Sequence, residues 1–147
     1  MKIKLGASGT DAIALKLRNA SERVSDRARK VMHRKADQIV ELAKLQAPVD
    51  KHNLEDSIEK RVTYGLRGRL QVDITVGGIV RGVDVSQYAV QIHENYNQMQ
   101  MGEGTKQKQK DNPQVVVGRK FLSRAVEFHR EALKQEMIQD VLKVWKL

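Results

Sequence analysis

The sequence predicts a single α+β domain that spans residues 1–147. Its elements are a long N-terminal helix, a short helix, a small antiparallel β-sheet made of a hairpin plus short strands, and a long C-terminal helix. Two observations predict this class. Apolar residues recur every three or four positions over 11–46 and again over 119–145, which is the spacing of one helix face. Within the region 61–85, apolar and polar residues alternate, which is the spacing of a half-buried strand.

The first helix is predicted over 11–46, with a cap at Thr10 or Asp11 and an end at Pro48. Lys35 fills the one gap in its apolar stripe. At about 1.5 Å per residue, a helix of about 35 residues is roughly 50 Å long. We therefore expect part of it to lack a partner within its own chain. The stripe consists of Ile13, Leu17, Ala20, Val24, Ala28, Val31, Ile39 and Leu42.

A short helix and a hairpin follow. Asp50 or Asn53 can cap the short helix, and Leu54 and Ile58 are its apolar positions. Two alternating runs then flank Arg67-Gly68, which predicts a β-hairpin. The apolar positions of these runs are Val62, Tyr64, Leu66, Leu70, Val72, Ile74 and Val76. For 79–85, two interpretations stay open, a short strand or a loop.

The second half of the chain has two ambiguous segments before its last helix. Residues 88–94 are short and apolar, so that a strand and a helix are both possible. The segment 96–113 is rich in Gln, Met, Lys, Gly and Asn, which predicts a mobile loop. Residues 115–117 predict a short strand. The helix predicted over 119–145 carries the apolar stripe Leu122, Ala125, Val126, Leu133, Met137, Val141 and Val144.

The composition limits the class of protein. The absence of cysteine excludes disulfide scaffolds, thiolate zinc sites and cysteine nucleophiles. No apolar run has the roughly 18 residues of a membrane span, and the first residues lack the apolar stretch of a signal peptide. We therefore expect a soluble protein made in the cytoplasm, with no membrane partner. The net charge of +9 suggests a polyanionic neighbour, either nucleic acid or an acidic protein surface, and scattered surface lysines are an equally good explanation.

The sequence offers no positive sign of catalysis. Its histidines, His33, His52, His93 and His129, fall in different predicted elements, with no second histidine at ligand spacing. The carboxylates of the short helix have no feature of an acid–base pair, and no glycine-rich segment matches a phosphate loop. We expect no catalytic residue, metal, cofactor or small-molecule substrate.

One electrostatic feature stands out on the first helix. Basic residues recur at spacings of four, three and four beside the apolar stripe, and they form a basic stripe of Arg23, Arg27, Lys30 and Arg34. Such a stripe can contact DNA phosphates or an acidic partner, and the simpler alternative is a solvated helix face. No aromatic residues are interleaved with it, which argues against a base-stacking platform.

Three blocks of residues resemble a known family. The first block is Ala47-Pro48-Val49-Asp50, then Asn53-Leu54, then Ser57-Ile58. It resembles the Ala-Pro-Val-Asp-Thr-Gly-x-Leu-x-x-Ser-Ile signature of tailed-bacteriophage neck and tail-completion proteins, with Lys51-His52 in place of the usual Thr-Gly. The second block is Tyr88-Ala89 followed by His93-Glu94, and the third is Lys120-Phe121-Leu122 with Ala125. In the third block, Lys120 stands in place of the usual Pro.

The resemblance covers roughly residues 10–145 and implies a structural protein of the virion, at the neck or upper tail, that joins head to tail. It implies a homo-oligomeric ring, six-fold more readily than twelve-fold, between neighbouring neck and tail proteins. Packaged DNA would pass through the channel. Tyr88 and Phe121 are then expected in the core or at a subunit seam. Two other hypotheses remain: a small basic nucleic-acid-binding module, and an enzyme with an unrecognised site.

Overall fold

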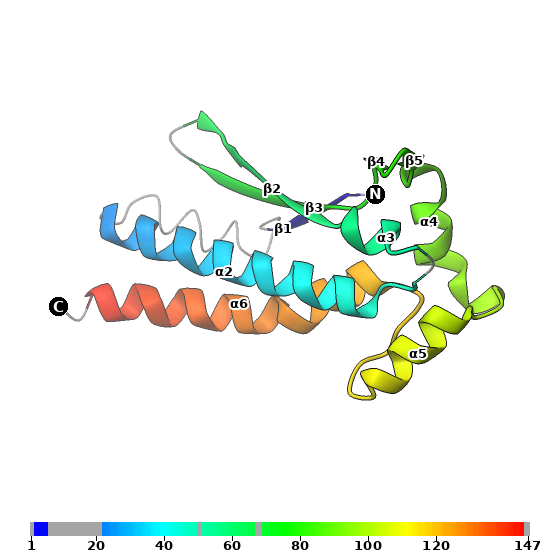
Figure 1. Ribbon diagram of the computed structural model, residues 1–147. Coiled ribbons are helices and arrows are strands. Elements are labelled where there is room, and N and C mark those ends of the chain that lie inside the picture. Colours follow the sequence, from blue (N-terminus) through cyan, green and yellow to red (C-terminus); the bar gives the residue numbers. More distant parts are fainter. Residues whose placement is uncertain (1, 6–21, 50, 67–68, 146–147) are drawn as a thin grey trace.

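The computed structural model describes residues 2–5, 22–49, 51–66 and 69–145. Two helices of 25 residues each, α2 (Glu22–Gln46) and α6 (Phe121–Trp145), run antiparallel and side by side. A three-stranded sheet lies on the other side of α2 (Figure 1). The predicted α+β class is confirmed. No helix in the described ranges is both long enough and apolar enough to cross a bilayer.

The helix α2 buries a broad face because it lies between α6 and the sheet. Its buried apolar residues recur at helical spacing and are Ala28, Val31, Met32, Ala36, Ile39, Val40 and Ala43. Lys35, which fills the gap in the predicted stripe, is also buried, and its Nζ lies 2.7 Å from Glu136 Oε1 on α6. An ion pair therefore closes the gap. The predicted part of this helix over 11–21 lies outside the described residues.

The helix α6 packs against α2 with the stripe that its sequence predicts. Leu122, Ala125, Val126, Leu133 and Met137 are all buried. The side chains of the last predicted members, at 141 and 144, lie outside the described part of the chain. Because the two stripes interlock along both helices, most of the core lies in this one seam.

The sheet has the strand order β1-β3-β2 and is antiparallel throughout. Its strands are β1 (Lys2–Leu5), β2 (Glu59–Tyr64) and β3 (Leu70–Thr75). In the register, Ile3 pairs with Ile74 and Val62 with Val72, so apolar residues share one face. Val72, Ile74 and Val76 are buried, as predicted for the apolar positions of the second strand, but the intervening Asp73 is buried too, so burial in β3 does not alternate. The strand β1 was not predicted.

Short elements make the remaining connections. The helix α3 (Asn53–Asp56) joins α2 to β2. Between β3 and α6 lie the two-stranded ladder of β4 (Ile79–Val80) and β5 (Val83–Asp84), α4 (Ser86–Asn95), the 3₁₀ turn η2 (Tyr96–Gln98) and α5 (Glu103–Asp111). Both open alternatives are resolved, since 79–85 contains a small strand pair and 88–94 is helical.

Two segments differ from their predictions. The segment 96–113 was predicted as a loop, but it contains η2 and the helix α5. An acidic residue in the first turn of α5 and lysines in its last turn interact favourably with the helix dipole and so stabilise the helix. Thr105 is the one buried side chain of α5. Residues 115–117 form no strand, and the side chain of Gln109 hydrogen-bonds their backbone instead.

Candidate functional site

The first motif block forms the turn from α2 into α3. The amide of Ala47 donates to the Ala43 oxygen at 2.9 Å, which is a helical bond, and Pro48 follows directly. Ala47, Leu54 and Ile58 are buried in the common core. Ser57 is also buried, and its Oγ donates to the Leu54 oxygen at 2.7 Å. The block therefore fixes the direction in which the chain leaves the long helix.

The turn between α2 and α3 holds His52 in the left-handed region, with φ 62°. The family signature usually has Gly at this position, and Gly adopts a positive φ without the steric cost of a Cβ. The prediction that Asn53 caps α3 is wrong. His52 occupies the N-cap without a side-chain cap bond, and Asn53 Oδ1 instead accepts from Arg81 Nη1 at 2.7 Å. Asp50 lies outside the described residues.

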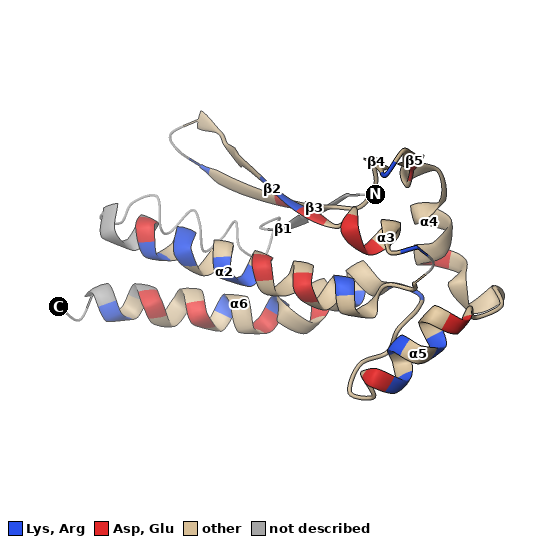
Figure 2. Ribbon diagram, viewed as in Figure 1, with Lys and Arg blue, Asp and Glu red and all other residues tan. Residues whose placement is uncertain are grey.

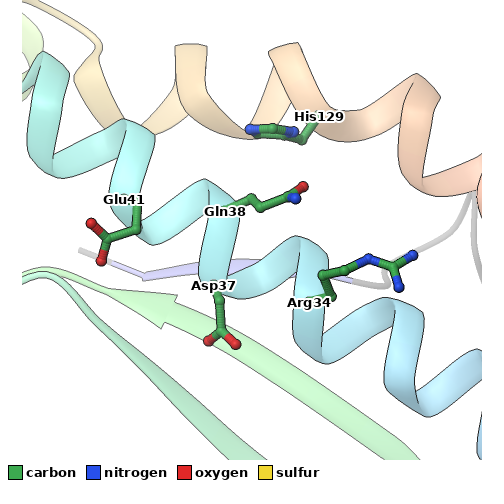
Figure 3. A pocket seen from close by; sticks show the side chains of 5 residues that line it. All are labelled: Arg34, Asp37, Gln38, Glu41 and His129. Atoms are coloured by element: carbon green, nitrogen blue, oxygen red, sulfur yellow. The ribbon is translucent and has the colours of Figure 1, made fainter.

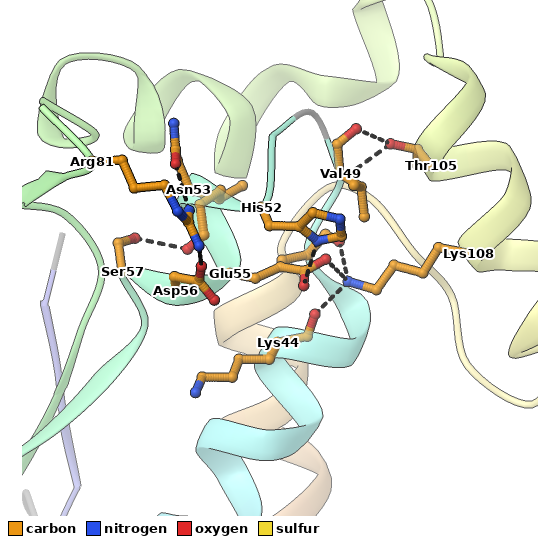
Figure 4. A network of polar contacts seen from close by, with 12 residues as sticks. Lys44, Val49, His52, Asn53, Glu55, Asp56, Ser57, Arg81, Thr105 and Lys108 are labelled. Atoms are coloured by element: carbon orange, nitrogen blue, oxygen red, sulfur yellow. Dashed lines mark hydrogen bonds and ion pairs between the residues drawn. The ribbon is translucent and has the colours of Figure 1, made fainter. Parts of the chain in front are cut away.

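The helix α5 is fastened to this turn by polar side chains (Figure 4). Lys108 Nζ donates to the main-chain oxygens of Lys44 and Ala47, at 2.5 and 2.8 Å, and it also pairs with Glu55. Thr105 Oγ1 accepts from the Val49 amide at 2.9 Å and donates to the Val49 oxygen at 3.1 Å. The last carbonyls of a helix lack intrahelical partners. The side chain of Lys108 supplies that partner to α2.

Arg81 fastens the opposite side of α3. It lies between β4 and β5, has a positive φ of 49°, and donates to Asn53 while pairing with Asp56. The first motif block is thus a junction at which α2, α3, α5 and the β4–β5 ladder meet. We call it the α2–α3 junction. Arg81, Thr105 and Lys108 belong to it but have no local sequence signal, because each binds a partner far along the chain.

The second and third blocks meet around His93. His93 on α4 is 2% exposed, and its ring packs edge-on against Phe121 with centroids 5.1 Å apart. The Lys120 amide donates to the His93 oxygen at 2.7 Å, and the Lys120 side chain pairs with Glu94. Ala89, Phe121 and Leu122 are fully buried, and the half-buried Tyr88 packs against the same core. Phe121 therefore lies in the core rather than at a seam.

The polar contacts of His93 fit a neutral ring. Its Nδ1 lies 2.8 Å from Glu94 Oε1, and its Nε2 lies 3.4 Å from the Ser123 amide and 3.3 Å from Ser123 Oγ. Burial lowers the pKa of His93, against the opposing effect of Glu94. A neutral ring donates from Nδ1 to Glu94 and accepts at Nε2 from the first turn of α6, whose amides need partners.

Ser123, His93 and Glu94 form a chain of the residue types that hydrolases use. The enclosed ring and the backbone amide at Nε2 make it a cap for α6 instead. The pKa of Glu94 is lowered by its hydrogen bond with Lys120 and then by His93. Within the part of the chain that the structure describes, no three His, Asp or Glu side chains are grouped to hold a metal ion.

The basic stripe divides into three parts. Arg27 and Lys30 are exposed on α2. Arg34 is engaged within the chain, because its Nη2 lies 2.5 Å from Glu136 Oε2 on α6. The side chain of Arg23 lies outside the described part. Figure 2 shows acidic residues among the basic ones along both long helices, so the stripe is not a uniform positive surface.

A shallow groove of about 610 Å³ lies beside Arg34 (Figure 3). It is lined by Arg34, Asp37, Gln38 and Glu41 of α2 and by His129 of α6. Burial lowers the pKa of His129, and the nearby Lys35 lowers it further. The lining mixes both signs of charge, with no cluster of donors for a phosphate. Among the described residues, the geometry thus joins helix ends and packs layers against one another.

A comparison with protein-family models agrees with this structural character. The model described as "Bacteriophage HK97-gp10, putative tail-component" matches residues 11–128. The match contains the first two blocks completely and the third block from Lys120 to Ala125. No curated protein and no solved structure matches the chain.

Proposed function

Because the chain belongs to the HK97-gp10-like family of phage tail components, we propose that it forms a ring at the head–tail junction, where it joins head to tail. As a tail component it is a structural protein of the virion. We favour a six-fold ring, with neck and tail proteins above and below it and DNA in the channel. The motif blocks support a structural role, since they build a junction of helix ends rather than a reactive site.

One observation carries the assembly role: α6 is apolar on two opposite sides. Its inner stripe packs on α2, but Phe128, Ile138 and Leu142 are exposed, with Phe128 exposed to 73%. Their spacing places them within one side of the helix, away from the buried stripe. Ile138 and Leu142 are one helical turn apart, and Phe128 lies about 15 Å further along the helix. Large exposed apolar side chains on one side of a helix support a contact with another protein. We infer that an adjacent protein of the neck or tail covers this side of α6.

The exposed members of the basic stripe fit an acidic partner better than DNA. Arg27 and Lys30 lie on a helix that also carries exposed acidic residues, Asp37 and Glu41 among them. A surface that follows DNA phosphates is expected to carry one sign of charge. The competing hypothesis of a small nucleic-acid-binding module rests on the net charge of +9 and on these same residues.

The test compares the wild type with Phe128→Gln and with Arg27→Gln/Lys30→Gln. Native mass spectrometry and electron microscopy measure assembly, alone and with the proteins of the neighbouring neck and tail layers, and DNA retardation measures binding. We expect the wild type and Phe128→Gln both to form closed rings, and we expect Phe128→Gln to weaken the binding of these rings to the neighbouring neck or tail layer. Glu127→Gln, at an exposed neighbouring position, is the matched control. The nucleic-acid-binding module would be supported instead by two results together. The protein would stay a monomer or dimer when the neighbouring neck and tail proteins are added. It would also retard DNA, and Arg27→Gln/Lys30→Gln would abolish that retardation.

A further inference from the structure

The β2–β3 hairpin ends in two large apolar side chains that its own chain leaves uncovered. Leu66 is 93% exposed and Tyr64 is 63% exposed. The amide of Gly65 donates to the Arg69 oxygen at 2.7 Å, so the end of the hairpin is closed by a backbone bond. In Figure 1 this end stands away from the α2–α6 pair. We call Tyr64, Gly65 and Leu66 the hairpin tip.

A second uncovered apolar position lies at the other end of the molecule, on the β4–β5 ladder (Figure 1). Ile79 is 77% exposed, and its cross-strand partner is the exposed Asp84. The base of the ladder is closed by a backbone hydrogen bond and by a close approach of Gly77 to Ser86. The Val85 amide donates to the Gly78 oxygen at 2.8 Å, and a Cβ at Gly77, where φ is 132°, would lie 2.6 Å from Ser86 Oγ.

The charges beside the two positions are of opposite sign. At the tip, the sequence over 62–70 contains Arg67 and Arg69 and no Asp or Glu. On the ladder, the exposed Asp84 lies opposite Ile79, whereas Arg81 pairs with Asp56 and Glu94 pairs with Lys120. An apolar tip flanked by arginines and an apolar ladder position beside an aspartate thus lie at opposite ends of the molecule.

We propose that the hairpin tip of one copy packs on the β4–β5 ladder of the next copy, with Leu66 against Ile79. This interface rests on the proposed function, because it is the lateral contact of the proposed ring. The two surfaces differ, so the contact is head-to-tail, and such contacts close into a ring when the rotation between successive copies divides a full turn evenly. A symmetric tip-to-tip contact would instead bring two sets of basic residues together, which costs free energy.

Cysteine cross-linking tests this interface directly, because the natural chain contains no cysteine. The variants Leu66→Cys and Ile79→Cys are assembled singly and as an equal mixture, and each sample is oxidised. We expect a cross-linked dimer in the mixture. In a chain that carries both substitutions, Leu66→Cys/Ile79→Cys, we expect a series of larger cross-linked oligomers. The mixture of Leu66→Cys with Gln107→Cys, an exposed position on α5, is the matched control and should give neither.

Each other outcome overturns the interface. Cross-linking of Leu66→Cys with itself would show a symmetric contact. Rings without the 66–79 cross-link would disprove this interface and leave the proposed function standing. Phage particles that contain no ring of this chain would contradict the interface and the proposed function alike. As a second measurement, Leu66→Ser should weaken self-association about tenfold or more, because burial of a leucine is lost. Thr63→Ser on the same hairpin should leave it unchanged.

Discussion

Lys108 Nζ donates to the main-chain oxygen of Ala47 at 2.8 Å, so a side chain of α5 closes the C-terminal end of α2. The two residues are 61 positions apart in the chain. The contact joins a helix that is mostly polar to the first residue of the first motif block. It explains how α5, with one buried side chain, keeps a defined place. The α2–α3 junction is therefore completed from outside its own segment.

Removing the charge of Lys108 tests how firmly α5 is held. We expect Lys108→Met to lower the free energy of unfolding by about 1–3 kcal/mol, because Glu55 and two backbone oxygens lose their partner. Thermal unfolding and hydrogen exchange over 103–111 are the measurements. Lys110→Met, at an exposed position of the same helix, is the control. Equal melting temperatures for Lys108→Met and Lys110→Met would instead favour the mobile loop that the composition of 96–113 predicts.

The left-handed turn at His52 predicts a stabilising substitution. His52→Gly should raise the free energy of unfolding by about 0.5–1 kcal/mol, because glycine removes the Cβ strain at a positive φ. His52→Ala is the control, since it removes the imidazole and its contact with Glu55 but keeps the Cβ. Chemical denaturation measures both. If His52→Ala raised the free energy of unfolding as much as His52→Gly, the effect would come from loss of the imidazole rather than from relief of backbone strain.

The buried His93 and the half-buried His129 predict a loss of stability in weak acid. The pKa values of His93 and His129 are lowered from 6.5 by burial, so the unfolded chain binds more protons than the folded one below about pH 6.5. Stability then rises with pH in this window, and it falls as the pH drops through the folded pKa values. The pKa values of Glu94 and Glu136 are also lowered, and their contributions are lost at more acidic pH.

The variant His93→Gln separates this contribution. Glu94, Lys120, Arg124 and Ser123 face the ring of His93 in the wild type. Between pH 7 and 5 we expect a flatter stability profile for His93→Gln than for the wild type, with a residual slope from His129. His52→Gln, at an exposed position, is the control. Parallel profiles for His93→Gln and the wild type would contradict the neutral cap.

The ion pair between Lys35 and Glu136 predicts strong coupling between the long helices. Glu136→Gln should destabilise the protein by about 1–3 kcal/mol, since it leaves the buried Lys35 without its carboxylate. Lys35→Met/Glu136→Gln should recover much of that loss, because the buried charge is gone. A double-mutant cycle by denaturant unfolding measures the coupling energy. A cycle whose effects simply add would show that the pair is unimportant.

Periodicity predicted the parts of the fold that apolar burial stabilises. The buried apolar faces of α2 and α6 and the buried apolar positions of β3 lie where the apolar spacing predicts them. The spacing is informative because every apolar residue on a face that packs against another layer is removed from water. The hairpin tip shows the limit of this rule, since Leu66 continues the alternation and yet is exposed. Alternation marks one side of a strand and does not say whether another layer covers it.

Polar contacts across the chain account for what the sequence did not predict. The helix α5 is held by Thr105 and Lys108, whose partners lie more than 50 positions away. Asn53 has the residue type of a cap, but Arg81 binds it instead. The strand β1 alternates Lys with Ile and Leu, yet it has only four residues and pairs with β3 only in the folded chain. Local patterns cannot specify such pairs.

Our central claim is that the chain forms a ring at the head–tail junction. Cryo-electron microscopy of the purified phage, with the neck reconstructed separately from the tail, tests it most directly. We predict closed rings of this chain between head and tail, six-fold, with the α2–α6 seam intact in every copy and the hairpin tip touching the neighbouring copy. Copies of the chain placed along the tail tube, or a neck without them, would contradict it.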